Sequence, residues 1–592
     1  MTASTKQIGH QLTPHTSEAV PNQVPPLTNY NLFLSDRTLV QALEREGASW
    51  AIQQVSELGR LLGTEEAQRW GFDANENKPV LHTHDRFGNR CDEVVFHPAW
   101  HSLMRISVAN RLHCLPWEMK TPGGTETRSG DAATRSKDKP ESLATNQTGS
   151  GAHVARAALM MLTVQNEAGH TCPISMTFSA VAALRAEPEL ACEWEPRILS
   201  SSYDPQFAPA QQKSGVLLGM GMTEKQGGSD VRANTTRAER IGNSREYLIT
   251  GHKWFCSAPM CDAFLVLAQA PKGLSCFLLP RWTPTGERNH FHIQRLKDKL
   301  GNRSNASSEV EFAQAWAHLV GEEGRGIQTI IEMVNHTRLD CSIAAAGLMR
   351  QALAQAVHHA RHRHAFGKLL IDQPLMRNVL ADLAIESEAA TLLMVRLARS
   401  FDMRESNHRE RAFCRIATAI AKYWLCKRSP VHVSEALECL GGNGYVEESI
   451  MPRLYREAPL YSIWEGSGNV MCLDVLRALA KDPATLEVLL AELQSTAGAD
   501  NRLDAYVTAI QERFSAKAGN GSPQSSSVND YAARELTERL ALALQASLVI
   551  RHSTPAVADA FITSRLAGQH GNAFGTLPAG IDVDGVLETV VF

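Results

Sequence analysis

The chain has 592 residues, of which 43% are hydrophobic and 21% are charged, and its formal net charge is -4. A chain of this length is too long for a single hydrophobic core, so several domains are expected. The composition is typical of a globular protein, and the charge balance does not indicate a polyanionic partner. Because no apolar run reaches the roughly 20 residues that a membrane span needs, no membrane contact is expected.

The first 27 residues contain one basic residue, Lys6, and four prolines. A secretory signal needs an apolar centre and a mitochondrial transit peptide needs repeated arginines, so neither leader is indicated. We interpret residues 1–27 as a disordered tail and expect a cytoplasmic protein. The twelve cysteines are scattered without any CxxC pair, which argues against a zinc site and against a disulfide framework.

Residues 28–171 are predicted to form an N-terminal helical domain, with Ser35–Arg60 as one helical stretch. The polar residues 119–151 interrupt this domain. Such a segment cannot bury enough apolar surface to offset the entropy lost when it is ordered. We therefore expect a disordered surface insertion there, followed by a helix over His153–Ala168.

Between residues 172 and 320 short apolar runs alternate with Gly and Asn turns, a pattern that predicts strands. The strand candidates are residues 216–222, 246–251, 263–268, 275–280 and 308–313. Because they follow one another without helices between them, we expect an antiparallel sheet or barrel.

The segment GMGMTEKQGGSD, residues 219–230, ends a strand candidate at Thr223 and continues into a Gly-Gly-Ser turn. Glycines let backbone N–H groups approach a phosphate, Ser229 adds a hydroxyl donor, and Thr223 can donate to a flat heterocycle. No GxGxxG opens a helix here, so this is not a Rossmann fingerprint. A glycine-rich hairpin turn without a ligand is the alternative interpretation.

The segment GHKWFCSAP, residues 251–259, places two aromatic residues beside small polar ones. These residues could pack on a ring system and donate to its edge. An amphipathic strand with core aromatics would show the same pattern, so the two interpretations stay open.

Residues 321–480 are predicted to form a second helical domain, with helices over 374–401 and about 407–440. In the segment before the first of these, His358 and His362 have the i, i+4 spacing of metal ligands. No carboxylate or cysteine lies near them, which favours a basic helix end over a metal site. Arg363 and Phe366 would suit a pyrophosphate and a stacked ring.

Glu465 stands between Trp464 and Gly466 in PLYSIWEGSGNVMCLDVLR, residues 459–477. A carboxyl group beside a large aromatic and a glycine can be desolvated yet reachable, which raises its pKa. A raised pKa is what a base that removes a carbon-bound proton needs. The alternative is a glutamate that merely favours the start of a helix through the helix dipole.

Residues 485–592 are predicted to form a helical extension, with Leu536, Leu540, Leu544 and Leu548 at i+4 spacing and a Gly- and Ser-rich loop at 518–528. The extension has seven Lys and Arg against twelve Asp and Glu. Phosphate contacts need basic side chains, so the extension as a whole is a poor surface for DNA.

Taken in order, these segments resemble the acyl-CoA dehydrogenase family, and within it the AidB branch of bacterial adaptive-response flavoproteins. The likeness runs from about Leu27 to Arg477 and fades in the extension. It rests on GMTEKQGGSD, GHKWF, RLKDKLGNRSNAS (295–307), RLYRE (453–457) and IWEGSGN (463–469). The family fold is α+β, with an N-terminal helical domain, a central antiparallel β-barrel domain and a C-terminal helical bundle, to which this chain adds the helical extension.

The resemblance implies that the chain binds FAD, with Glu465 as the catalytic base and no metal. The residues implied to hold the flavin half are Met222, Thr223, Gly228, Ser229, Phe255, Cys256, Ser257, Ile463, Trp464, Gly466, Ser467, Gly468 and Asn469. Two further patches are implied to reach the FAD of a neighbouring subunit. They comprise Arg363, Phe366 and Gln373, and Glu438, Gly441 and Gly442. A cofactor shared between subunits implies a homotetramer.

The implied reaction is α,β-dehydrogenation of a short, branched acyl-CoA thioester, with an electron acceptor like electron-transfer flavoprotein. An alternative is an AidB-type flavoprotein that binds double-stranded DNA weakly through its C-terminal region and protects it from alkylation, with little dehydrogenase turnover. A third is a scaffold whose C-terminal helices only mediate assembly. The chain departs from the family pattern at residues 119–151, which have no counterpart, and at Trp464, Ser467 and Asn469, where Tyr, Thr and Gln are usual. Residues 335–338, where some relatives carry the base, contain no carboxylate.

Overall fold

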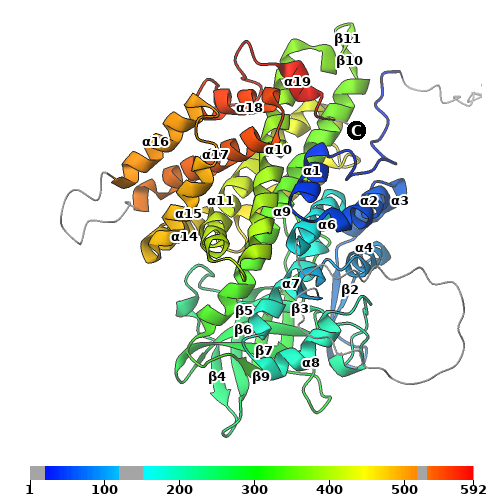
Figure 1. The fold of residues 1–592 in the computed structure, drawn as a ribbon. Coiled ribbons are helices and arrows are strands. Elements are labelled where there is room, and N and C mark those ends of the chain that lie inside the picture. Colours follow the sequence, from blue (N-terminus) through cyan, green and yellow to red (C-terminus); the bar gives the residue numbers. More distant parts are fainter. Residues whose placement is uncertain (1–20, 119–150, 516–529, 591–592) are drawn as a thin grey trace, which may run out of the picture.

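The computed structural model describes residues 21–118, 151–515 and 530–590 (Figure 1). The expected insertion up to residue 150, the first 20 residues of the expected tail and the loop at 518–528 lie outside the described residues. Residues 21–27 do not behave as a loose tail. The Asn22 amide donates to the backbone oxygen of His364 at 2.9 Å, and the His358 ring bonds the backbone oxygen of Pro25 at 2.8 Å. The expected boundary at residue 27 is therefore too late.

The N-terminal part is helical as expected, but it also contains a β-hairpin that the sequence analysis missed. The hairpin consists of β1 (Val80–His84) and β2 (Arg90–Val95). Asp85 closes its turn by accepting the backbone N–H groups of Phe87 and Asn89. The helices are α1 (Arg37–Arg45), η1 (Ser49–Ala51), α2 (Ile52–Leu62), α3 (Glu65–Glu76), α4 (Pro98–Ala109), α5 (Leu115–Glu118) and α6 (Ala152–Asn166).

The strand-rich part begins later than predicted, because residues 171–198 form helices. These are α7 (Thr171–Leu184) and α8 (Pro188–Ile198). Almost every residue of α7 is buried, so its sequence shows no polar face to give it a helical period. The boundary expected at residue 172 is therefore wrong, and the sheet starts near residue 218.

The central domain is a barrel-like sheet, as expected. A closed circuit of paired strands runs β4–β5–β9–β7–β6 and back to β4, with β3 beside β6 and β8 beside β9. Most pairings are antiparallel, but β6 runs parallel to both β3 and β4. All five strand candidates are confirmed, and β4 and β8 are additional. The elements are η2 (Ala210–Gln212), β3 (Leu218–Gly221), η3 (Val231–Ala233), β4 (Arg237–Arg240), β5 (Glu246–Ser257), β6 (Ala263–Ala270), β7 (Gly273–Pro280), β8 (Phe291–Leu296) and β9 (Ser307–Val320).

The second helical domain is built on α9 (Gly326–His362), which runs from the β domain to a small hairpin at the opposite end of the molecule (Figure 1). Its 37 residues make a rod of about 55 Å. The expected helices 374–401 and 407–440 are confirmed as α10 and α11, which pack on α9. The other elements are β10 (His364–Ala365), β11 (Lys368–Leu369), η4 (Leu370–Asp372), α10 (Pro374–Met403), α11 (His408–Cys439), α12 (Gly442–Tyr445), α13 (Met451–Glu457), η5 (Ala458–Ser462) and α14 (Gly468–Lys481).

The C-terminal extension is helical and packs against this bundle, mainly through α17 on α10, α11 and α14. The four leucines at i+4 spacing all lie on α17 and are buried, as their spacing predicted. The elements are α15 (Pro483–Gln494), α16 (Asn501–Ser515), η6 (Asp530–Ala532), α17 (Ala533–His552), α18 (Pro555–Phe561), η7 (Ile562–Leu566) and α19 (Val583–Leu587).

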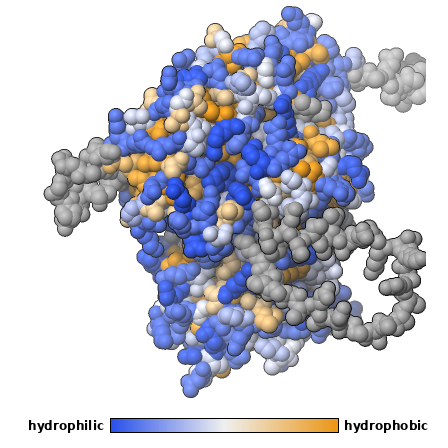
Figure 2. Space-filling view, in the orientation of Figure 1, coloured by the Kyte–Doolittle hydropathy of each residue, from blue (hydrophilic) through white to orange (hydrophobic). Residues whose placement is uncertain are grey.

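On the face drawn in Figure 2, hydrophilic residues predominate and hydrophobic ones gather only in small groups. Within the described ranges, no helix is both long and apolar enough to cross a membrane. The same ranges contain no group of three or more His, Cys, Asp or Glu residues arranged to hold a metal ion.

Candidate active site

Glu465 lies in the turn between η5 and α14, where the helical bundle meets the β domain. Its φ is +58°, and Gly466 follows with φ +102°. A left-handed conformation is costly for a residue with a side chain, so other contacts must hold it. Arg338 Nε donates to the Glu465 carbonyl at 3.0 Å, and Lys422 Nζ donates to the Gly466 carbonyl. Side chains from α9 and α11 thus fix the backbone that presents the carboxyl group.

The carboxyl group of Glu465 is free to accept a proton or a hydrogen bond from a ligand. Its Oε2 atom is buried and has no hydrogen-bond partner among the described residues. Burial is the largest influence on its pKa and raises it, while Thr337, Arg338 and Lys422 oppose this rise. An unsatisfied buried carboxyl oxygen is costly, and such an atom marks a place where a ligand or a proton belongs.

The β domain forms the opposite wall through the end of β5 and the loop before β9. The hydroxyl groups of Ser257 and Ser307 are 3.2 Å apart. The buried Cys172 thiol lies close to both domains: burial raises its pKa to about 12, and the Glu465 charge adds to this effect. Lys299 Nζ donates to the Asn305 carbonyl at 2.6 Å, and burial is the main cause that lowers its pKa to about 8.

Two buried carboxylates anchor this β-domain loop. Glu167 accepts the Ser304 hydroxyl at 2.8 Å, and Glu457 accepts the backbone N–H and the side-chain amide of Asn302 at 2.6 and 2.9 Å. The Asn305 amide, in contrast, has no hydrogen-bond partner within the described part of the chain. The motif RLKDKLGNRSNAS pointed to this loop, but no sequence signal identified its anchors.

The turn that carries Thr223, Gly228 and Ser229 is held in place by the buried carboxylate of the neighbouring Glu224. Lys253 Nζ donates to Glu224 at 2.8 Å. Burial would raise the pKa of Glu224, but the Lys253 ammonium and nearby donors outweigh burial and lower the pKa to about 2. A Cβ on Gly228 would lie 2.4 Å from the Thr223 hydroxyl oxygen, so a larger residue there would force the Thr223 side chain to move.

At the end of β5, some side chains point into the barrel core and others toward the candidate active site. Phe255 is 50% exposed, and Lys297 Nζ lies 4.5 Å from its ring centroid and 3.8 Å from that of Trp254. A register shift between Lys253 and Cys256 interrupts the pairing with β9. The Cys256 side chain is fully buried in the barrel, so it cannot serve as a side-chain contact to a cofactor. Ser257, and not Cys256, faces the site.

The residues around Glu465 differ in exposure. Ile463 is exposed, Trp464 is half-buried with its ring edge-on to Tyr461 at 6.2 Å, and Met222 is half-buried beside the turn. A Cβ on Gly468 would lie 3.0 Å from the Lys427 side chain, so α14 starts in close contact with α11. Ser467 and Asn469 are exposed, and Ser467 caps α14 without a side-chain hydrogen bond.

The two patches assigned to a neighbouring subunit do not meet Glu465 within this chain. Arg363 lies 26 residues beyond Thr337 along α9, about 39 Å away. Phe366 is 99% exposed with φ +52°, and Gln373 donates to the Ala365 carbonyl at 3.0 Å. The second patch is also open to solvent: it consists of the exposed residues Glu438, in the last turn of α11, and Gly441 and Gly442, which follow that helix.

The histidines on α9 are used locally. The rings of His358 and His362 are in contact, with centroids 4.3 Å apart and planes inclined by 44°, and the His362 ring bonds the His358 carbonyl at 2.8 Å. Their i, i+4 spacing is therefore explained by contact between the two rings and by hydrogen bonds to backbone carbonyls.

Residues that the sequence did not single out complete the Glu465 turn. Arg338 also donates to Asp474 at 2.9 Å, which links α9 to α14. Thr337 and Arg338 were considered only as the alternative position of a base, and Lys422 not at all. These contacts join residues more than 40 positions apart, so no local spacing could have revealed them.

Comparison with known proteins covers nearly the whole chain. The Adaptive response protein AidB N-terminal domain matches residues 22–140 and 133–205, the acyl-CoA dehydrogenase middle domain matches 219–315, and the C-terminal domain of that family matches 324–480. AidB of Escherichia coli strain K12 is 45% identical over 541 residues, which are 91% of this chain and 93% of that protein. Acyl-CoA dehydrogenase family member 11 of Caenorhabditis elegans is 28% identical over 94% of this chain and 88% of its own length.

Two solved structures have a similar fold. ACDH-11 of Caenorhabditis elegans in complex with C11-CoA has a TM-score of 0.81 at 26% identity and covers 95% of each chain. The apo form of Bd2924 has a TM-score of 0.75 at 27% identity and covers 91% of this chain and 99% of its own.

Proposed function

This chain belongs to the acyl-CoA dehydrogenase family, and from that premise we propose that it dehydrogenates a short, branched acyl-CoA with Glu465 as the general base. Members of the family are FAD-dependent oxidoreductases, and the recognition of AidB-type domains here is confirmed. Which thioester is the substrate, which residue is the base and which protein accepts the electrons are parts of the proposal.

The observation that carries the proposal is the state of the Glu465 carboxyl group. Its Oε2 atom is buried without a partner, and burial raises its pKa. A general base works best when its pKa lies near the working pH, and burial moves the pKa of the Glu465 carboxyl in that direction. The backbone around it is fixed by Arg338 and Lys422, so the carboxyl group is held in place before a substrate arrives.

The residues on the β-domain side fit an FAD flavin. The turn at Thr223, Gly228 and Ser229 offers hydroxyl and backbone donors, and at Gly228 a Cβ would come within 2.4 Å of the Thr223 hydroxyl oxygen. Phe255 presents an exposed ring, and the Asn305 amide lacks a protein partner. FAD bound there would supply the acceptor for the hydride from the β carbon, while Glu465 removes the α proton.

The two distant patches favour a cofactor shared between subunits. Arg363 and Phe366 lie about 39 Å from the Glu465 region along α9, so they cannot complete a site around Glu465 in their own chain. Phe366 is almost fully exposed, which suits a ring that covers a ligand in another molecule. We infer a homotetramer in which each FAD contacts two chains.

The substrate class rests on the relatives. ACDH-11, whose fold matches along 95% of this chain, was solved with C11-CoA. An acyl-CoA thioester is therefore the substrate class to test first here. Trp464 is half-buried next to Glu465, and we propose that its ring limits the acyl group to a short chain.

DNA protection by the C-terminal extension is the second candidate, and the ion pairs of the extension argue against it. Each described arginine of the extension is bonded to a neighbouring side chain. The pairs are Arg502 with Asp500 and Asp559, Arg513 and Arg539 with Glu535, Arg551 with Glu492, Arg565 with Asp382 and Glu386, and Arg534 with the Tyr423 hydroxyl. Binding phosphates would require these charges to leave their partners. We propose instead that the extension stabilises the bundle.

The test is a screen of acyl-CoA thioesters for anaerobic bleaching of the flavin absorbance in the FAD-loaded protein. We expect short, branched thioesters to reduce the flavin fastest. A protein that binds FAD but whose flavin no acyl-CoA reduces would contradict the proposed reaction.

A further inference from the structure

The β domain contains a second hollow, separate from the candidate active site. It lies between the outer face of the barrel and α8 and has a volume of about 260 Å³. Trp316 lies in this hollow, whereas Ser307 on the same strand lies at the Glu465 site. The two are nine residues apart, which corresponds to about 30 Å along β9.

Strand register builds the floor of this hollow. Along β9, Ala315, Ala317 and Leu319 point into the barrel, while Trp316 and His318 point outward. Glu246 at the start of β5 is the cross-strand partner of His318. The floor therefore combines an indole ring, an imidazole and a carboxylate.

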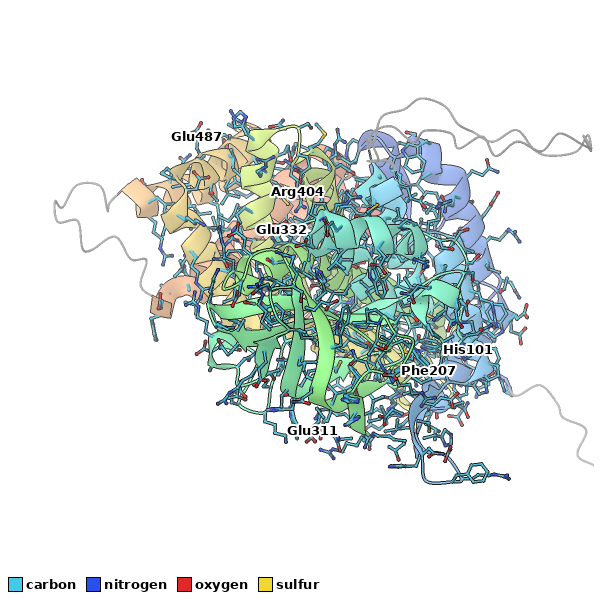
Figure 3. The ribbon with its side chains drawn as sticks, turned by 90° about the horizontal axis from the view of Figure 1, so that it is seen from below. His101, Phe207, Glu311, Glu332, Arg404 and Glu487 are labelled. Atoms are coloured by element: carbon cyan, nitrogen blue, oxygen red, sulfur yellow. The ribbon has the colours of Figure 1, made fainter. Side chains whose placement is uncertain are left out.

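Helix α8 forms the wall. Glu189 and Glu193 are separated by four residues and so share one face of the helix, with Trp194 beside them. Trp282 closes the end of the hollow. One side of its ring is covered by Phe207, labelled in Figure 3, at 5.7 Å between centroids, and by Arg288.

The charges of the hollow are unbalanced. Asp262 is neutralised by Lys213 Nζ at 2.7 Å. Glu189, Glu193 and Glu246 have no ion pair with any residue in the described ranges, and the lining contains no Lys or Arg. Three free carboxylates thus surround a space walled by three tryptophans.

We propose that this hollow binds a small aliphatic amine that carries one or more ammonium groups, such as a diamine. Ammonium groups are attracted to the faces of indole rings and form charge-assisted hydrogen bonds with carboxylates. The apolar methylene chain of such an amine would lie against the tryptophan rings. A volume of about 260 Å³ is below the range of drug-sized pockets, which fits a small ligand.

The test is calorimetric titration of the FAD-loaded, full-length protein with 1,5-diaminopentane, with 1,5-pentanediol as the uncharged probe of the same length. We expect saturable binding of the diamine and no saturable binding of the diol. The double substitution Glu193→Gln and Glu246→Gln should weaken diamine binding about tenfold or more, because two charge-assisted contacts are lost. Trp316→Leu should weaken it about fivefold through the lost cation–π contact.

The matched control is Glu311→Gln, which removes an exposed carboxylate of the same strand outside the hollow, labelled in Figure 3. It should change the diamine affinity less than about twofold, since exposed charges at this distance are screened. The proposal is overturned if the diamine does not saturate by about 10 mM. It is also overturned if the diol binds equally well, or if the double variant and Glu311→Gln bind the diamine alike.

Discussion

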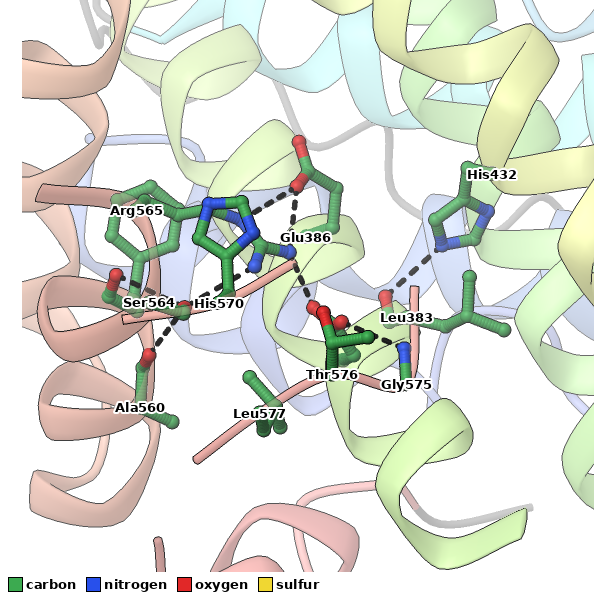
Figure 4. A network of polar contacts seen from close by, with 12 residues as sticks. Leu383, Glu386, His432, Ala560, Ser564, Arg565, His570, Gly575, Thr576 and Leu577 are labelled. Atoms are coloured by element: carbon green, nitrogen blue, oxygen red, sulfur yellow. Dashed lines mark hydrogen bonds and ion pairs between the residues drawn. The ribbon is translucent and has the colours of Figure 1, made fainter. Parts of the chain in front are cut away.

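Glu465 in the candidate active site and Glu386 beneath the C-terminal extension are both buried carboxyl groups, but their surroundings are opposite. Glu465 leaves one oxygen without a partner, and burial raises its pKa. Glu386 accepts hydrogen bonds from Arg428 at 3.0 Å. It also accepts one from Arg565 at 3.0 Å (Figure 4). Burial alone would raise its pKa, but these guanidinium groups outweigh burial and lower the pKa to about 2.

This difference in pairing distinguishes a carboxyl group available for a reaction from one that only stabilises the fold. A buried charge that is fully paired stabilises one arrangement of helices and has no capacity left for a ligand. A buried acceptor that is left unpaired costs stability, and proteins keep such groups where a substrate or cofactor completes them. The same contrast applies to the arginines of the extension, which are paired, and to Asn305 at the site, which is not.

The largest effect is expected for Glu465→Gln, which tests whether the unpaired carboxyl group is the base. The amide keeps the shape of the turn but cannot accept the α proton, so the rate of flavin reduction should fall about 10²–10⁴-fold. The measurement is single-turnover flavin reduction by the best acyl-CoA, with retained FAD absorbance as evidence of an intact site. In the wild type the rate should rise with pH through a pKa above the ordinary glutamate value, because only the ionised carboxylate is a base. Equal rates in the variant and wild type would show that Glu465 is not the base.

The second prediction concerns the paired region. Arg565→Ala leaves Asp382 and part of Glu386 without a counter-charge in a buried place, which should lower the free energy of unfolding by about 3 kcal/mol. The matched control is Arg539→Ala at the exposed pair with Glu535, which should cost less than about 1 kcal/mol. Urea unfolding followed by circular dichroism distinguishes them. Equal losses in the two variants would mean that the buried cluster is not a special source of stability.

The third prediction uses the pKa of Glu386. Its pKa of about 2 in the folded protein is below its ordinary value of about 4.3, so its ion pairs stabilise the fold fully above that value. The contribution should be lost as the pH falls from about 4.3 to about 2, at a cost of about 3 kcal/mol. Glu386→Gln should show a flatter loss of stability over this interval. An unchanged acid profile in that variant would contradict the assignment.

A smaller effect is expected for Arg363→Ala, which tests whether the distant patch takes part in cofactor binding. Loss of a charge-assisted contact to a phosphate should raise the FAD dissociation constant about tenfold and weaken the tetramer. Arg409→Ala, at an exposed position at the start of α11, is the control and should change neither. FAD retention after gel filtration and sedimentation velocity give the two readouts. A wild-type monomer with full FAD occupancy would refute the shared cofactor.

The smallest effect is expected for DNA. Because the described arginines of the extension are paired and the extension is net acidic, duplex binding should be weak and should fall steeply with salt. Any binding should centre on faces that include Arg477 or Arg551. A gel-shift series at rising salt is the measurement. Tight, salt-insensitive binding would show that the extension binds DNA although its described arginines are paired.

The sequence by itself determined the order of domains and the identity of the base candidate. Periodic apolar residues predicted α10, α11 and α17, and the strand candidates were confirmed because alternation along a strand is a local property. The motif around Glu465 placed a carboxyl group between an aromatic and a glycine. That pattern survives in the fold, because the turn at Glu465 and Gly466 requires an unusual backbone that a glycine eases.

Only the tertiary structure decided which groups surround these residues. Helix α7 was missed because burial on all sides removes the polar face that reveals a helix. Cys256 was placed with the flavin contacts, but a register shift turns its side chain into the barrel. Arg338, Lys422 and the Arg565–Glu386 pair join segments far apart in the chain, and the tryptophans of the second hollow come from α8, β9 and the loop after β7. Packing brings such groups together, and no local pattern records which distant residue completes a pair.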